Sequence, residues 1–383
     1  MAGFGFDEAQ EMLRRQVKDF AQKELAPGAQ KRNATTKAPR EVARRLGEMG
    51  LLAIPVPEKY GGQGSDWVSY AIALEELARV DFFASMAPIY AGVAYVLLSQ
   101  TPEEKWRQWL PPVLQGERIC CFAVSEPEAG SDAAAMKLTA TRDGDGYILN
   151  GEKTSISVGM DADVALLFAK TNPKERAHGI TTFWVPLDLP GIVRSHLPHT
   201  GYKPMAAASI IFDGVRIPAA NRISEEGKGF YAAAGGMDFL RPSLGMVSLG
   251  MAEAALDAAA SYALQRTAFG RPIAKFEGVS FKVAEHATRL EAARLLCYRT
   301  FYLRDLGLPH TKESAMCKWW CPVVAFDAVH DAILLHGHIG YSEEFPLEQR
   351  LRDLLGMEFA DGTAQIMKII IAREMMGRVA VPY

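Results

Sequence analysis

The amino-acid sequence predicts an α+β fold with an N-terminal helical domain, a middle antiparallel β domain and a C-terminal four-helix bundle. The apolar residues recur at helical spacing at first, occur in short strand-like runs from about residue 118, and return to helical spacing near residue 228. A chain of 383 residues is long enough for two or three domains. We therefore expect domain boundaries at 1–117, 118–227 and 228–383.

The first domain is predicted to be helical because its apolar residues follow a period near 3.6. The first apolar stripe ends at Leu25, two residues before Pro27, and another helix ends at Gly50. Residues 55–62 contain two prolines and two glycines, which is typical of a loop. Helices are expected at 6–25, 41–49, 67–79 and 86–114.

The second domain is predicted to be an antiparallel sheet, sandwich or barrel because short apolar runs follow one another closely. Strands are expected at 119–124, 137–142, 147–150, 164–169, 180–185 and 208–212. Asp143-Gly144-Asp145-Gly146 is a strong hairpin signal between two of them.

The third domain is predicted to be an antiparallel bundle because long helical patterns continue from Gly229 to the end of the chain. The four helices are expected at 230–265, 277–306, 313–335 and 363–378.

Composition excludes several classes of function. Hydrophobic residues make up 49% and charged residues 23%, and the formal net charge is -3, so bulk electrostatics favour neither nucleic acid nor an anionic membrane. No secretory signal or apolar run of bilayer length occurs, which predicts a cytoplasmic protein, or one that resides in an organelle after processing. The five cysteines do not form a disulfide framework. Cys317 and Cys321 lack a second pair at metal spacing, so buried thiols are expected and no metal site.

The common nucleotide-binding and metalloenzyme motifs are missing. No glycine-rich dinucleotide fingerprint, phosphate loop or H-E-x-x-H pair occurs, and His336 and His338 beside Gly337 are more typical of packing than of metal ligation. A polar loop, Ser125 to Asp132, follows an apolar strand. Its hydroxyls and backbone N–H groups suit a phosphate or a heterocycle edge, although a plain capped turn fits the same residues.

A second polar loop, Phe359-Ala360-Asp361-Gly362-Thr363, leads into the last helix. Asp361 among apolar neighbours is a candidate general base. Asp or Thr is also a common N-cap, and the helix N-terminus suits an anion. Spacing alone leaves these alternatives open.

Taken together, six ordered motifs resemble the acyl-CoA dehydrogenase family over essentially the whole chain. They are Pro57 to Gly62, Ser125 to Asp132, Asn150 to Lys153, Arg266 to Gly270, Asp361 to Ile366, and Ile371 to Glu374. The resemblance implies a homotetramer with FAD between the β domain and the bundle, and an electron-transferring flavoprotein as acceptor. It also implies that Asp361 removes the substrate α-proton, while its backbone N–H and a flavin hydroxyl hold the thioester oxygen.

The resemblance also assigns binding roles. Ser125 and Ser157 would bind the isoalloxazine ring, and Ser131 the CoA or pyrophosphate end. The remaining cofactor contacts would be Arg266, Phe269 and Gly337 from the adjoining subunit, with Thr363 and Gln365 at the flavin nucleotide. The CoA or acyl contacts would be Asp238, Arg241, Ala360 and Gly362. Two structural alternatives stay open: Arg266 as a helix cap, and Asp238 with Arg241 as an intrahelical pair.

The sequence departs from the family pattern around the expected acyl group. Asp361 stands where most members have Glu, Ala360 where Tyr is common, and Ser155 where Trp is usual. The less common position for the base is Leu240, which cannot take a proton. Glu277 and Leu334 replace residues that usually contact the neighbour's FAD.

These changes make room beside the α-carbon, and an Asp base resembles members that act on alicyclic thioesters. We therefore expect conversion of cyclohexane-1-carboxyl-CoA to cyclohex-1-ene-1-carboxyl-CoA. Residues 82–102 contain no Asp or Glu, which argues against a substrate that already carries the ring double bond and needs a second acid.

Three alternatives remain on sequence grounds. One is a dehydrogenase of short straight or α-methyl-branched acyl-CoA, and another is a non-redox acyl-CoA-binding relative. The third is an oxidase-like reaction in which oxygen accepts the electrons.

Overall fold

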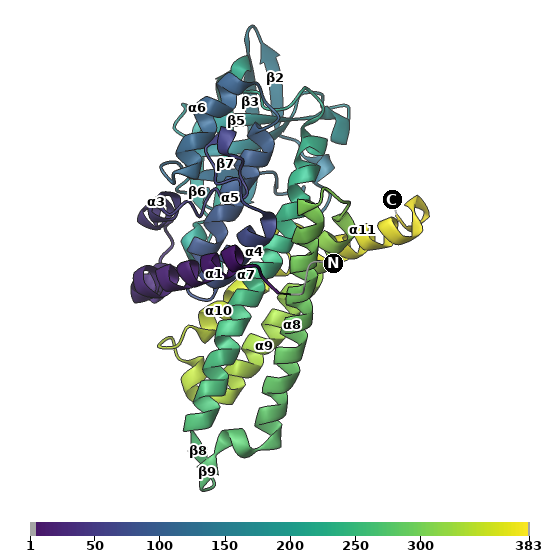
Figure 1. Ribbon diagram of the computed structural model, residues 1–383. Coiled ribbons are helices and arrows are strands. Elements are labelled where there is room, and N and C mark those ends of the chain that lie inside the picture. Colours follow the sequence, from purple (N-terminus) through teal and green to yellow (C-terminus); the bar gives the residue numbers. More distant parts are fainter. Residues whose placement is uncertain (1–4, 382–383) are drawn as a thin grey trace. The chain divides into compact units, whose positions relative to one another are not determined.

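The computed structural model describes residues 5–381, with the side chains of 232–237 left out (Figure 1). The chain forms two compact units, described separately below. Unit 1 contains the chain up to Asn33, Asp66–Ser85, and the chain from Asp238. Unit 2 contains Ala34–Ser65 and Met86–Met237.

Unit 2 is built on a seven-stranded sheet in the order β1-β4-β2-β3-β7-β6, with β5 paired to β4. Its strands are β1 (Cys120–Ala123), β2 (Thr139–Asp143), β3 (Gly146–Ile156), β4 (Val164–Lys170), β5 (Ile180–Pro186), β6 (Ile192–His196) and β7 (Ala208–Pro218). Every residue of β4 is buried, which explains its unbroken apolar sequence. Helices α3 (Arg40–Glu48) and α6 (Glu103–Leu114) and most of α5 (Phe82–Leu98) belong to the same unit.

The predicted hairpin is confirmed. Asp143 pairs with Gly146, so Gly144 and Asp145 form a two-residue turn between β2 and β3. Gly144 has φ +58°, a conformation that glycine adopts without steric cost.

The sheet differs from the prediction in two respects. Most strand pairs are antiparallel, but β1 pairs with β4 in parallel, as does β2 over a single residue pair. The long chain between β1 and β4 permits this crossover, whereas a short turn would not. Strand β6 was not predicted because its Ile-Val-Arg-Ser-His sequence is short and mostly polar, as suits an edge strand.

Unit 1 is helical. It contains α1 (Glu8–Phe20), α4 (Trp67–Ala78), most of α7 (Gly229–Gln265), α8 (Glu277–Asp305), α9 (Thr311–His336), α10 (Leu347–Met357) and α11 (Ala364–Met376), with part of α2 (Ala29–Ala34). Helix α9 packs against α8, α10 and α11, which makes it the central element of this unit (Figure 1). The predicted helical character of the C-terminal region is confirmed, and α10 is an additional helix that the prediction missed.

The start of α1 illustrates how local sequence fixes a helix end. The Asp7 carboxylate accepts a hydrogen bond from Gln10 N, and the Gln10 side chain accepts one from Asp7 N. This reciprocal capping box satisfies two N–H groups that have no partner inside the helix.

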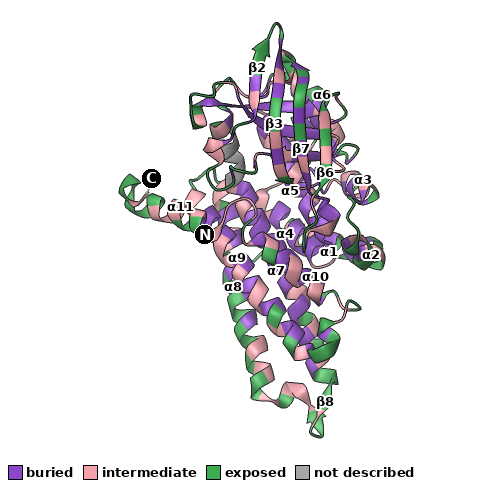
Figure 2. Ribbon diagram, turned by 180° about the vertical axis from the view of Figure 1, so that it is seen from behind, coloured by how far each residue is buried: buried purple, intermediate pink, exposed green. Residues whose placement is uncertain are grey.

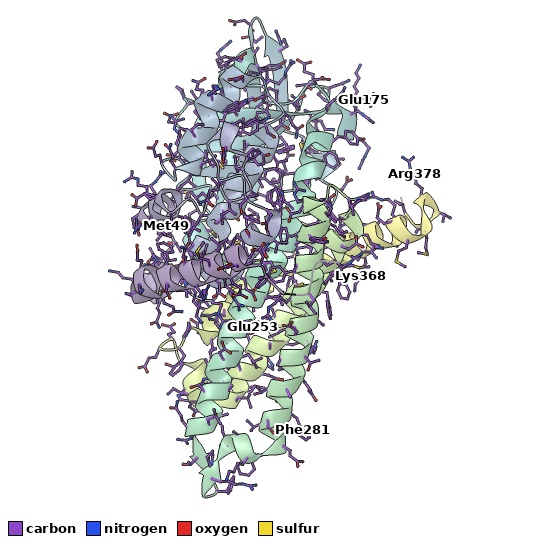
Figure 3. The ribbon with its side chains drawn as sticks, viewed as in Figure 1. Met49, Glu175, Glu253, Phe281, Lys368 and Arg378 are labelled. Carbon is purple, nitrogen blue, oxygen red and sulfur yellow. The ribbon has the colours of Figure 1, made fainter. Side chains whose placement is uncertain are left out.

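Some of the charged side chains that unit 1 buries are paired with an opposite charge. Arg294 Nε on α8 donates to Glu75 Oε1 on α4 over 2.7 Å, and its guanidinium also pairs with Glu253 on α7, labelled in Figure 3. Removing one partner from such a pair leaves a buried charge uncompensated, so the pairing specifies how these helices meet.

The cysteines are all free and buried, as predicted. Cys297 Sγ on α8 lies 3.5 Å from Cys321 Sγ on α9, inside the helical core. Within the described residues, no helix is sufficiently long and apolar to cross a membrane.

Candidate active site

The loop that carries Asp361 is a turn between α10 and α11, residues 358–363, which we call the 358–363 turn. Asp361 and Gly362 both have positive φ, +54° and +115°. Left-handed backbone is unfavourable for a residue with a Cβ, and such strain is often concentrated at functional sites. A Cβ on Gly362 would lie 2.6 Å from Met367 Cε, the flexible end of that side chain, so the positive φ is the stronger reason for glycine at this position.

The backbone N–H of Asp361 is available to a ligand. Neither this N–H nor the Asp361 carboxylate makes a hydrogen bond with any other described residue. The carboxylate is an acceptor and the N–H is a donor on the same residue. The turn therefore offers one group to take a proton and another to bind an oxygen that gains negative charge.

Burial raises the pKa of Asp361, and the positive charges of Lys318 and Arg241 oppose that rise. Burial likewise lowers the pKa of Arg241, while Asp238 and Asp361 oppose the decrease. A carboxyl group whose pKa is raised is a stronger base when ionised, and the two cations keep it from being protonated too easily.

Asp238 and Arg241 form the intrahelical pair that the sequence left open. Arg241 Nη1 lies 3.4 Å from Asp238 Oδ1 on α7, and Asp238 Oδ2 accepts a hydrogen bond from Thr311 Oγ1 on α9. Arg241 Nε, however, is buried and has no hydrogen-bond partner among the described residues. Because an unpaired buried donor is costly, Arg241 retains capacity for an anionic or carbonyl ligand.

Thr363 acts as the N-cap of α11, since its Oγ1 accepts a hydrogen bond from Ile366 N over 3.3 Å. The N-cap alternative is therefore realised by Thr363 and not by Asp361. Gln365 lies in the first turn of α11 with an exposed side chain. Ala360 precedes Asp361 and is partly exposed.

Two of the predicted flavin contacts lie on neighbouring segments of unit 2. Ser125 O accepts a hydrogen bond from Thr154 N over 2.9 Å, which ties the Ser125 loop to the end of β3 just before Ser157. The hydroxyls of Ser125 and Ser157 make no hydrogen bond to any residue that the structure describes. Ser155 and Val158 beside them have positive φ, +57° and +54°.

These open hydroxyls fit the polar edge of a flavin ring. Both hydroxyls are partly exposed, and the hydrogen bond from Thr154 N to Ser125 O joins the two segments that carry them. Positive φ at Ser155 and Val158 gives the second segment a backbone conformation that residues with a side chain rarely adopt. Ser131 lies further along the same loop and is exposed. The residues present in unit 2 therefore suit FAD.

A buried ion pair supports the Ser125 loop, and the sequence prediction missed it. Lys153 Nζ is completely buried and donates to Glu126 Oε1 and to Val124 O, each over 2.8 Å. Glu126 in turn accepts hydrogen bonds from the backbone N–H groups of Lys137 and Leu138. Burial lowers the pKa of Lys153 to about 8, and Glu126 opposes the decrease. The available sequence signal was one charged residue in each of two family-like motifs: Glu126 within Ser125 to Asp132, and Lys153 at the end of Asn150 to Lys153.

Lys318 is a second buried lysine beside a candidate site residue, and the sequence prediction missed it as well. It is completely buried on α9, and its Nζ donates to Met357 O over 2.8 Å and to Gly362 O over 3.1 Å. The signal was a single lysine in the apolar run Cys317-Lys318-Trp319-Trp320-Cys321.

Arg266, Phe269 and Gly337 lie at the opposite end of α9 from Lys318. Gly337 follows the last residue of α9, and stacking of Tyr262 on His336 with ring centroids 4.5 Å apart brings the end of α7 to the same place. Nineteen residues separate Lys318 from Gly337 (337 − 318), which is about 28 Å along a helix. These three residues are therefore remote from Asp361 within one chain.

The hairpin that carries two of these residues is exposed. Phe269, between β8 (Thr267–Ala268) and β9 (Arg271–Pro272), is 95% exposed and has φ +51°. Arg266 is also exposed, and it makes backbone hydrogen bonds to Tyr262 and Ile273. An exposed aromatic ring and guanidinium are free to bind another molecule.

The candidate base Asp361 lies in unit 1, and the candidate flavin ligands Ser125 and Ser157 lie in unit 2. Three family models match the chain: the N-terminal domain of acyl-CoA dehydrogenase over residues 7–117, the middle domain over 121–215, and the C-terminal domain over 227–376.

Known proteins agree with this match. The chain is 38% identical to an acyl-CoA dehydrogenase of Bacillus subtilis (strain 168), over 97% of this chain and 98% of that protein. It is 37% identical to the mitochondrial short-chain specific acyl-CoA dehydrogenase of Mus musculus, over 96% and 90%. The structure of butyryl-CoA dehydrogenase from Megasphaera elsdenii superposes with a TM-score of 0.93 at 32% identity, covering 97% and 99% of the two chains.

The chain therefore belongs to the acyl-CoA dehydrogenase family. It is an FAD-dependent enzyme that dehydrogenates acyl-CoA thioesters. The predicted fold class, enzyme class and cofactor are confirmed.

Proposed function

We propose that this enzyme oxidises a thioester whose acyl group is a ring at the α-carbon, converting cyclohexane-1-carboxyl-CoA to cyclohex-1-ene-1-carboxyl-CoA. The observation that carries the proposal is the pair Ala360-Asp361 in the 358–363 turn. A carboxylate shorter by one methylene, next to a methyl side chain instead of a ring, leaves volume that a substituted α-carbon fills.

In this proposal Asp361 removes the α-proton. An α-hydrogen beside a thioester becomes acidic when the carbonyl oxygen is held by donors, because negative charge collects there in the transition state. The unpaired backbone N–H of Asp361 supplies one such donor. FAD, when bound, supplies the acceptor for the β-hydride.

The remaining assignments are proposals of the same kind. Ser125 and Ser157 bind the isoalloxazine edge, and Ser131 lies toward the CoA or pyrophosphate end. Thr363 and Gln365 contact the flavin nucleotide through the start of α11. Arg241 and Asp238 contact the CoA portion, which gives the unpaired Arg241 Nε an acceptor. Ala360 and Gly362 line the acyl group.

We propose that the active form is a homotetramer in which a second copy supplies Arg266, Phe269 and Gly337 to the FAD of its neighbour. The distance between these residues and Asp361 along α9 supports this arrangement. Exposed apolar side chains at the hairpin and at the end of α11 give a second copy a surface to cover; Figure 2 shows green, exposed residues in both places. The exposed apolar residues in or next to these two segments include Leu264, Phe269, Met375, Met376 and Val379.

Three further assignments complete the proposal. The electron acceptor would be an electron-transferring flavoprotein, and the enzyme works in the cytoplasm, where five free thiols stay reduced. The chain divides functionally at 1–117, 118–227 and 228–383.

A second candidate is the oxidation of a short straight-chain acyl-CoA. The 37% identity to a short-chain specific relative favours it. In that case Asp361 reaches a less hindered α-carbon through a shift of the 358–363 turn.

The deciding experiment compares kcat/KM for cyclohexane-1-carboxyl-CoA and butyryl-CoA with one dye acceptor. We expect at least a tenfold preference for the ring substrate, which corresponds to about 1.4 kcal/mol of transition-state binding. Equal or better activity with butyryl-CoA would remove the alicyclic proposal. Flavin absorbance that bleaches on substrate addition separates both candidates from a non-redox relative, and peroxide formed as fast as dye is reduced would indicate an oxidase.

A further inference from the structure

The 358–363 turn has a backbone shape that its own sequence does not favour. Asp361 and Gly362 take positive φ in succession, and only the second is a glycine. In the 358–363 turn, the backbone hydrogen bonds are made by the residues that precede Asp361. The N–H groups of Glu358, Phe359 and Ala360 donate to carbonyls of α10. A group outside the turn must therefore hold the part that carries Asp361.

Lys318 is that group. Its Nζ donates to Met357 O, where α10 ends, and to Gly362 O, just before α11 begins, with Glu358 O at 3.5 Å. One ammonium thus connects the two ends of the turn from a third helix. The acceptor Met357 O belongs to the last turn of α10, where carbonyls lack helical partners and attract a cation.

Lys318 carries a charge although, among the described residues, its hydrogen-bond partners are all backbone carbonyls. Its side chain is completely buried, and burial lowers its pKa to about 8, with Asp361 opposing the decrease and Arg241 adding to it. Carrying a cation here without a hydrogen-bonded carboxylate is costly. A purely structural contact between helices would be met at less cost by an apolar side chain.

The charges that face Asp361 come from two helices. Lys318 lies on α9 and Arg241 on α7, and both oppose the effect of burial on the Asp361 carboxyl. Burial and the charge of Asp327 raise the pKa of Glu358, in the turn itself, and the positive charge of Lys318 opposes that rise. Lys318 is the only one of the two cations that also bonds to the turn's backbone in the described structure.

We propose that Lys318 is a positioning residue for the base. It fixes the 358–363 turn so that the Asp361 carboxylate and N–H keep the separation and direction that proton removal needs. The effect on catalysis rests on the proposed role of Asp361, whereas the effect on the turn does not.

The test uses the FAD-loaded enzyme with Lys318→Met, which keeps a linear apolar side chain and removes the charge and its donors. The first readout is amide hydrogen exchange, measured by mass spectrometry on peptides that cover 357–363. We expect at least tenfold faster exchange in these peptides and no change in peptides of α8. Unchanged exchange in the turn, or a uniform increase through the whole of unit 1, would overturn the proposal.

The second readout is kinetic. We expect kcat to fall 10- to 100-fold with KM changed less than threefold. The acid limb of the kcat–pH profile should move to higher pH, because one of the two cations that oppose protonation of Asp361 is gone. A loss confined to KM would indicate a substrate-binding role and would contradict the assignment.

Lys368→Met is the matched control. Lys368 lies on α11, labelled in Figure 3, with its Nζ over the Trp319 ring at 4.6 Å from the centroid. It joins α11 to the same helix α9 without touching the carbonyls of the turn. The control should leave both exchange at 357–363 and kcat within twofold, and a tenfold change in either would mean that packing of α11 on α9 explains the Lys318 effect.

If Lys318→Met does not yield folded protein, Lys318→Arg tests whether Lys318 positions the 358–363 turn. The guanidinium keeps the charge and the donors on a bulkier head, so exchange at 357–363 and kcat should both change by about three- to tenfold. No change in either would refute the proposal. If exchange increases as expected while Asp361→Asn keeps normal turnover, Lys318 still fixes the turn and it is the identity of the base that fails.

Discussion

Asp361→Asn separates catalysis from folding at this site. Asparagine has the same shape as aspartate and is among the few residues that tolerate positive φ, so the backbone conformation at +54° should persist. The change removes the capacity to take a proton and the charge that attracts Lys318 and Arg241, and it retains the size and shape of the side chain. A positioned general base contributes about 10²- to 10⁴-fold, so we expect kcat to fall by that factor, or about 3–5 kcal/mol of transition-state stabilisation.

The effect on stability should have the opposite direction. Burial is the main cause of the raised pKa of Asp361 and outweighs the attraction of Lys318 and Arg241. An ionised carboxylate whose folded-state pKa is raised costs stability once the pH exceeds its unfolded value. The neutral amide avoids this cost, so the melting temperature at pH 7 should be equal to or above that of the unaltered enzyme.

The assay measures kcat with saturating acyl-CoA and a dye acceptor, together with flavin content and thermal unfolding. Asp19→Asn on α1 is the matched control, since its exposed carboxylate pairs with Lys23 at 3.4 Å on the same stretch of helix. It should keep kcat within twofold. Near-normal turnover of Asp361→Asn with bound flavin would refute the assignment of Asp361 as the base.

Three further outcomes are expected. Asp361→Glu should retain activity and shift the ratio of kcat/KM toward butyryl-CoA, and an unchanged ratio would contradict our account of the shorter side chain. With the ring substrate, kcat/KM should fall as the pH decreases through a value above the ordinary carboxyl pKa, because burial raises the pKa of Asp361; an acid limb at or below the usual value of about 3.9 would be inconsistent with this. Lys153→Met should cost about 3–5 kcal/mol in urea unfolding and weaken FAD retention, because Glu126 is left buried without its cation, and full retention with unaltered stability would exclude a supporting role.

Much of the fold follows from local sequence. The hairpin at 143–146 and the long helices of the C-terminal region depend on turn residues and apolar spacing, and both are visible without the structure. The edge strand β6 and the parallel pairing of β1 with β4 are not, because pairing partners lie far apart in the chain and a short polar strand leaves no alternating pattern.

The sequence predicted candidate site residues only where they lie in a motif that resembles the family. Asp361, Ser125 and Thr363 lie in motifs that match the family, so their positions were available from sequence. Whether Thr363 or Asp361 caps α11 depends on backbone conformation, and the structure assigns the cap to Thr363.

The sequence by itself determined the family, the enzyme class, the cofactor and the residue that stands at the place of the base. The tertiary structure alone revealed that Lys318 reaches both ends of the 358–363 turn, and that Lys153 and Glu126 support the Ser125 loop. The physical reason is that a buried lysine acts through neighbours distant in sequence. Its hydrogen bonds go to backbone carbonyls, which every residue type has, so the sequence does not show which residues accept them.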